Sequence, residues 1–125
     1  MTWDNAEKTI IRTTIEGQWD VNDLHRLISQ APTMMAEVSH SVDGIFDFSR
    51  STSTPTSALM TSSRMESAYN DRQRLFIVVG ANSYIQALCN IAAKLAPKTF
   101  SKLMFVDTMN DAYAAINKHT DQIRA

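Results

Sequence analysis

The chain has 125 residues, of which 44% are hydrophobic and 20% are charged, and its formal net charge is −1. This composition is that of one globular domain spanning residues 1–125. It excludes an extensively disordered chain, and it excludes binding to nucleic acid through a strong overall positive charge.

Cysteine content and the first residues bear on where the protein acts. The single cysteine, Cys89, excludes an intrachain disulfide and is typical of a reducing compartment. Residues 1–5 lack the basic and apolar regions of a signal peptide, and no apolar run reaches the ~20 residues of a membrane-spanning helix. We therefore expect a cytoplasmic protein that does not span a membrane.

The N-terminal segment is predicted to form a short strand pair. Residues 8–16 are rich in β-branched side chains, which favour a strand that ends at Gly17. We expect Trp3 to lie on a short preceding strand that pairs with this one through a turn at Asp4 and Asn5.

A helical pattern follows. Apolar residues between positions 21 and 38 recur at helical spacing, with Asp20 or Asn22 as the N-cap. Pro32 falls inside this pattern. Because proline removes a backbone donor and clashes with the preceding turn, we expect a kink or break that leaves two helical pieces.

The middle of the chain combines a strand with a hydroxyl-rich segment. Residues 42–48 predict a second strand, and residues 49–57 predict a loop. Thr54 followed by Pro55 is typical of a helix start, so a helix is expected to run to about Tyr69.

The clearest strand comes next. Residues 74–80 contain a continuous apolar run, as expected for a central strand that is covered on both faces. Asn82 or Ser83 then caps a predicted helix. Its apolar positions are Ile85, Leu88, Cys89, Ala92 and Leu95.

Residues 102–107 predict a last strand, and Asn110 or Asp111 is the expected N-cap of a final helix. Strands that alternate with helices imply right-handed crossovers and a mainly parallel sheet. With the short strand at Trp3, the sequence predicts an α/β fold with a mixed, mostly parallel sheet of four or five strands and about four helices.

The sequence shows no motif for nucleotide binding, metal binding or catalysis. Its three glycines are too far apart for a Rossmann or P-loop fingerprint. The three histidines fall on different predicted elements, and Cys89 lies on the apolar side of its helix. We therefore expect no catalytic residue, no metal and no cofactor.

Two aspartates and a glycine fall near the C-terminal ends of predicted parallel strands. Ligands bind at this edge of α/β sheets, so Asp47, Gly80 and Asp107 define an alternative site for a small ligand or lipid. Helix capping and turn formation account for the same residues without a ligand.

Thr56 and Ser57 are candidate phosphorylation sites. If Thr54 caps the helix, Ser57 is its third residue, and a phosphate there would meet unpaired backbone donors at the positive helix end. Hydroxyl groups that simply cap and solvate a helix start explain the same pattern.

Four segments resemble STAS domains, the domains of sulfate transporters and anti-sigma factor antagonists, and above all small bacterial antagonist-like proteins. The first two, residues 14–20 (TIEGQWD) and 45–49 (IFDFS), are like a strand ending in Gly-x-x-Asp and a hydrophobic-Asp-hydrophobic-Ser strand. Residues 56–59 (TSAL) stand where the family has Ser/Thr-Ser-Gly-Leu. Residues 107–112 (DTMNDA) are like its strand followed by a helix that opens with an acidic residue and alanine. The match spans about residues 8–118.

The resemblance implies a STAS-like fold and a non-enzymatic regulatory domain that binds a protein partner. In antagonist members of the family, a kinase-type anti-sigma factor is the partner and phosphorylates a serine that corresponds by position to Ser57. Pro55 and Ala58 stand where the family has an acidic residue and a glycine.

We expect the partner to bind through the loop and helix of residues 49–65. The candidate contact residues are Asp47, Ser49, Thr54, Leu59 and Met60. A second copy of the chain is another expected partner, because an exposed edge strand near Trp3 could pair two chains.

Overall fold

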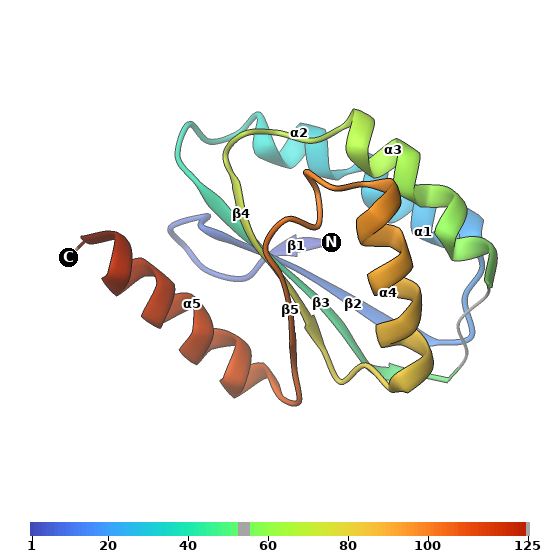
Figure 1. Cartoon of the computed structure of the whole chain (residues 1–125). Coiled ribbons are helices and arrows are strands. Elements are labelled where there is room, and N and C mark those ends of the chain that lie inside the picture. Colours follow the sequence, from blue (N-terminus) through green and yellow to red (C-terminus); the bar gives the residue numbers. More distant parts are fainter. Residues whose placement is uncertain (53–55, 125) are drawn as a thin grey trace.

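The structure is a computed structural model that describes residues 1–52 and 56–124. Within those residues, five strands form one mixed sheet in which the strand order follows the chain (Figure 1). The strands are β1 (Thr2–Trp3), β2 (Ile10–Gly17), β3 (Val42–Ser51), β4 (Gln73–Val79) and β5 (Leu103–Val106). β1 pairs with β2 in antiparallel fashion, and all other neighbours are parallel. The prediction of a mixed, mostly parallel sheet is confirmed.

The strand order decides where the helices lie. Each parallel strand is added on the same side of the one before, so right-handed crossovers place every connecting helix on one face of the sheet. These elements are α1 (Val21–Ser29), α2 (Ala31–Met35), the 3₁₀ helix η1 (Thr56–Thr61), α3 (Ser62–Ser67) and α4 (Ser83–Leu95). Among the described elements, only α5 (Met109–Arg124), which follows the last strand, covers the other face (Figure 1). We call the two sides the crossover face and the α5 face.

Local sequence explains the first helices. Asp20 caps α1, because its carboxylate accepts a hydrogen bond from the Asp23 N–H at 2.8 Å and the Asp23 carboxylate accepts one from the Asp20 N–H at 3.0 Å. The helix ends at Ser29, and a new short helix begins at Ala31 with Pro32 in its first turn. The break expected at Pro32 is confirmed.

Three predicted boundaries were wrong. Residues 49–51, predicted to be loop, continue β3 because Arg50 and Ser51 pair with β2 beyond a register shift. Residues 56–61 form a 3₁₀ helix instead of the start of an α-helix, and α3 ends at Ser67. The last helix is capped by Thr108, whose hydroxyl accepts a hydrogen bond from the Asp111 N–H at 3.1 Å. Thr54 and Pro55 lie outside the described residues.

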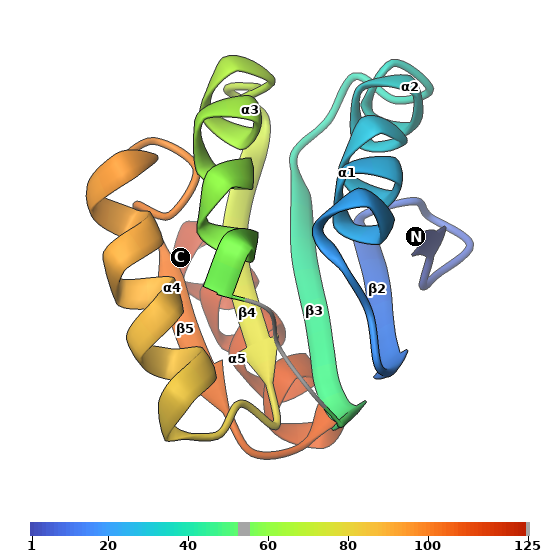
Figure 2. The ribbon, with the colours of Figure 1, turned by 90° about the vertical axis from the view of Figure 1, so that its right-hand side faces the viewer.

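The two faces of the sheet have different cores. On the α5 face, side chains that alternate along β3 and β4 pack against Ala112 and Ile116 in one cluster; the sheet residues are Ile45, Leu75, Ile77 and Val79. The crossover face has three smaller clusters. Figure 2 shows why, since α1 and α2 lie over β2 and β3 while α3 and α4 lie over β4 and β5.

No helix of the described residues has the length and apolar character that crossing a membrane requires.

Candidate functional site

The end of β3 holds two of the predicted contact residues in a local turn. The Asp47 carboxylate accepts hydrogen bonds from the Ser49 N–H at 2.9 Å and from the Ser49 hydroxyl at 2.6 Å. Turn formation of this kind explains Asp47 without a ligand, as the sequence also allows. Asp47 therefore orients Ser49; Asp47 is half-buried and Ser49 is exposed.

Gly80 fills the space between the ends of β3 and β4. Its φ is +69°, and a Cβ added there would lie 2.9 Å from both Cα and Cβ of Ser49. Only glycine permits this approach, so the residue serves the close packing of two strand ends. Its N–H donates to the Val106 carbonyl oxygen at 3.0 Å, and Asp107 beyond it is exposed.

The segment with the candidate phosphorylation sites lies between two helices. η1 contacts both α1 and α4. Ala58 packs on the Trp19 side, toward α1, while Leu59 packs toward Ala92 of α4. Ser57 precedes this half-buried pair in the chain, and it is exposed. The side chains of Thr56 and Met60 are not among the described parts of the chain.

The 3₁₀ form of η1 makes the segment a weaker phosphate site than the sequence predicts. The favourable site for a phosphate required the N-terminus of an α-helix with aligned backbone dipoles. A 3₁₀ helix of six residues offers poorer alignment. Ser57 therefore has an exposed hydroxyl but no helix end that would hold a phosphate strongly.

The outer surface of α4 carries an apolar stripe that the sequence interpretation missed. Tyr84, Leu88, Ile91 and Leu95 recur at intervals of four, three and four residues, so they share one side of the helix. Tyr84 and Ile91 are each 46% exposed and Leu95 is 56% exposed. Leu95, one of the apolar positions expected on this helix, therefore faces outward, unlike Ile85 and Ala92, which are buried. The signal was present, because α4 has apolar residues on both sides and a sheet covers only one of them.

The cysteine of α4 is not activated for nucleophilic chemistry. Burial raises the pKa of the Cys89 thiol to about 11, so the thiol stays protonated near neutral pH. In the part of the chain that the structure describes, no group of three or more histidine, cysteine, aspartate or glutamate side chains is placed to hold a metal ion.

Two apolar cavities lie between the crossover helices and the sheet. One is bordered by α1, α2 and α3, and the other by α1, η1 and α4. Neither is lined by Asp47, Gly80 or Asp107, so these cavities do not correspond to the ligand site expected at the strand ends.

Comparison of the chain with protein-family models, curated proteins and solved structures finds no match. Its function must therefore be argued from the geometry of its own residues. The features that require an explanation are the apolar stripe of α4, the adjoining η1 segment and the cavities beneath them.

Proposed function

We propose that this chain is a non-enzymatic regulatory domain of the STAS type that binds a protein partner through η1 and α4. We define the η1–α4 surface by Ser57, Tyr84, Leu88, Ile91 and Leu95. The observation that carries the proposal is the exposed apolar stripe on α4. The resemblance described above supports the STAS assignment, as does a sheet whose strand order follows the chain.

The stripe has the character of a protein-docking surface. Spacing of four, three and four residues is that of the contact seam between packed helices, which indicates a partner that presents an apolar helix or groove. Complete burial of a fully exposed leucine or isoleucine contributes roughly 1.5–3 kcal/mol. Because Ile91 and Leu95 are about half exposed, covering both contributes roughly as much as burying one such side chain. Among the described residues, the exposed large apolar side chains are Tyr84, Ile91, Leu95 and Met104, and three of these four lie on this stripe.

Ser57 offers a way to control docking. It is exposed at the start of η1, which packs against α4, so a phosphate there would add ~1.5–2 negative charges near that helix. Partner binding would then have to desolvate that charge or pair it. The resemblance suggests a kinase-type anti-sigma factor as both partner and modifying enzyme.

Paired variants test the docking surface. Ile91→Glu with Leu95→Glu should abolish partner capture in a cross-linking pull-down, whereas Gln86→Glu with Asn90→Glu, on exposed polar positions of the same helix, should leave it intact. Equal capture by both double variants would show that the stripe is not the docking surface.

A second pair tests the switch separately. Ser57→Asp should weaken capture, and Ser63→Asp, at an exposed serine in α3, should not. If Ser57→Asp binds like the unchanged protein while the stripe variant fails, the docking surface stands and the switch is wrong.

Sedimentation of the protein alone identifies a second copy as the partner if Leu95→Glu abolishes a concentration-dependent dimer.

A further inference from the structure

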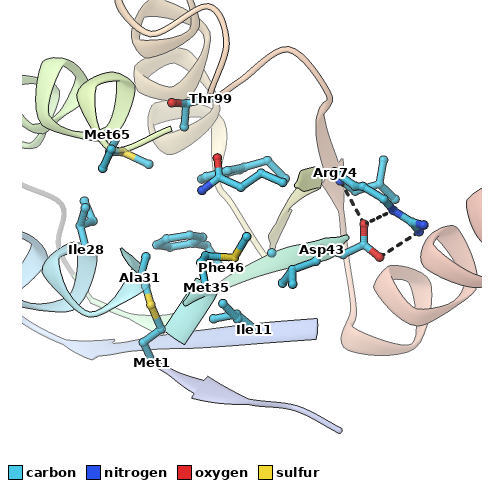
Figure 3. A pocket seen from close by; sticks show the side chains of 16 residues that line it. Met1, Ile11, Ile28, Ala31, Met35, Asp43, Phe46, Met65, Arg74 and Thr99 are labelled. Carbon is cyan, nitrogen blue, oxygen red and sulfur yellow. Dashed lines mark hydrogen bonds and ion pairs between the residues drawn. The ribbon is translucent and has the colours of Figure 1, made fainter. Parts of the chain in front are cut away.

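The cavity bordered by α1, α2 and α3 has a volume of about 90 Å³ and lies over β3. Figure 3 shows Ile28, Met35, Phe46 and Met65 around it. These are aliphatic, aromatic and thioether side chains from four different elements. A space lined mainly by such side chains favours an apolar occupant over water.

Gly44 forms part of the wall of this cavity where any other residue would place a side chain. Its φ is not in the positive region, and a Cβ added there would meet only the Leu75 carbonyl oxygen, at 3.9 Å. The backbone therefore does not require glycine. Glycine inside a strand weakens the strand, and it often marks a place where a ligand approaches the backbone closely.

A second cavity adjoins the first on the side of α4. The second cavity, of about 70 Å³, shares Ile28, Phe46, Met65 and Phe76 with the first. The Phe46 and Phe76 rings are stacked with centroids 4.9 Å apart, and they border both spaces. Together the two volumes match the ~150 Å³ of an apolar cavity that binds benzene. Two neighbouring spaces that share these side chains form an elongated apolar region, which suits an unbranched chain.

The polar groups at the edge of the cavity indicate an uncharged ligand. Asp43 and Arg74 form two hydrogen bonds of 3.2 and 3.1 Å, and the Leu75 N–H donates to the same carboxylate at 3.1 Å. Their charges compensate each other. Gln73 also lines the cavity, and no hydrogen bond joins its side-chain amide to another of the described residues. That amide can donate to or accept from one polar group of a ligand.

We propose that this cavity binds an uncharged amphiphile with an unbranched aliphatic chain. The chain lies over Gly44 between the thioethers of Met35 and Met65, and the polar group bonds to the Gln73 amide. Methionine side chains are flexible and polarisable, so they adapt to chains of different length. This site is separate from the η1–α4 surface, and its occupation does not depend on a protein partner.

The test uses 1-alkanols as probes and methionine methyl groups as reporters. In protein labelled with [¹³C-methyl]methionine, titration with 1-hexanol should shift the Met35 and Met65 signals saturably. Met104, which lies on β5 away from the cavity, should not shift. Affinity should rise about fourfold per methylene from 1-butanol to 1-hexanol. No saturable shift, or equal shifts at all methionines, would overturn the proposal.

Cavity-filling variants complete the test. Gly44→Val and Ala31→Leu each fill the space from a different side, so each should weaken 1-hexanol binding by about tenfold or more. Thr14→Val, on the other face of the sheet, and Leu95→Glu, in the stripe, should leave it unchanged. Binding by both filling variants equal to that of the unchanged protein would refute the assigned site. Hexanoate should bind more weakly at pH 7, and tighter binding would refute an uncharged ligand.

Discussion

The two faces of the sheet are covered in different ways. On the α5 face, one helix of 16 residues closes a single core cluster in which Ile45, Ile77 and Ala112 are completely buried. On the crossover face, short segments of five to nine residues and the longer α4 share the same task, and two cavities remain beneath them. A single long helix packs one continuous ridge onto a sheet, whereas several short ones leave space at their junctions.

The difference follows from topology and bears on function. A strand order that follows the chain sends every crossover to one side, which crowds that side with helix ends and loops. Structural rigidity therefore comes mainly from the α5 face. The crossover face, with its looser packing and its exposed stripe on α4, can bind ligands or partners at a smaller cost in stability.

The largest expected effect is a difference in stability between core truncations on the two faces. Ile77→Ala, at a fully buried position of the α5 face, should lower the free energy of unfolding by about 4 kcal/mol. Met35→Ala, beside the cavity, should lower it by about 2 kcal/mol, because Met35 already borders empty space. Urea denaturation of both variants measures the difference. Equal losses would contradict the contrast between the faces.

The buried ion pair of Asp43 and Arg74 joins the two faces, and its disruption should have the next largest effect on stability. Asp43 is buried, and Arg74 reaches from it to the Thr120 hydroxyl of α5 at 3.1 Å. Asp43→Asn keeps the shape but leaves the guanidinium without its countercharge, at a cost of about 3 kcal/mol.

An exposed ion pair provides the control for this experiment. Glu16 and Arg50 are 3.2 Å apart, and both side chains are largely exposed. Glu16→Gln should change stability by less than about 1 kcal/mol. If Asp43→Asn cost as little as Glu16→Gln in urea denaturation, the pair would not act as a link between the faces.

Three glycines provide a graded series. Gly80→Ala should cost about 2 kcal/mol, since it combines a positive φ with a Cβ only 2.9 Å from Ser49. Gly17→Ala has a positive φ but open space, and it should cost about 1 kcal/mol. Gly44→Ala should change stability by less than about 0.5 kcal/mol in thermal unfolding. A large loss at Gly44 would mean that the fold itself, and not a ligand, requires glycine there.

Most elements could be predicted from sequence because their signals are local. Asp20 and Pro32 act through neighbouring backbone groups, so the start of α1 and the break after it follow from residue type alone. The uninterrupted apolar run of β4 likewise reflects burial on both faces. The extension of β3 through Ser51 could not be foreseen, since it depends on pairing with β2 past a register shift.

The candidate sites were harder to predict, because they depend on how elements meet. Ser57 was identified from its neighbours, but the 3₁₀ form of η1 depends on packing between α1 and α4. Leu95 is apolar at helical spacing, and only the position of the sheet shows that it is exposed. The cavity over Gly44 is made by side chains from distant parts of the chain, which no local pattern reveals.

The smallest perturbation is chemical labelling of Cys89, which needs no substitution. Cys89 lines the second cavity, so its reactivity measures how closed the crossover face is at that point. Burial raises the pKa of this thiol from its ordinary value of 9.0 to about 11. Because only the thiolate reacts, alkylation by iodoacetamide at pH 8 should be about a hundredfold slower in the native protein than in urea. The native rate should still rise about tenfold per pH unit up to pH 10, whereas an ordinary thiol levels off above about pH 9. A native rate equal to that in urea would mean that the helices of this face open readily around the second cavity.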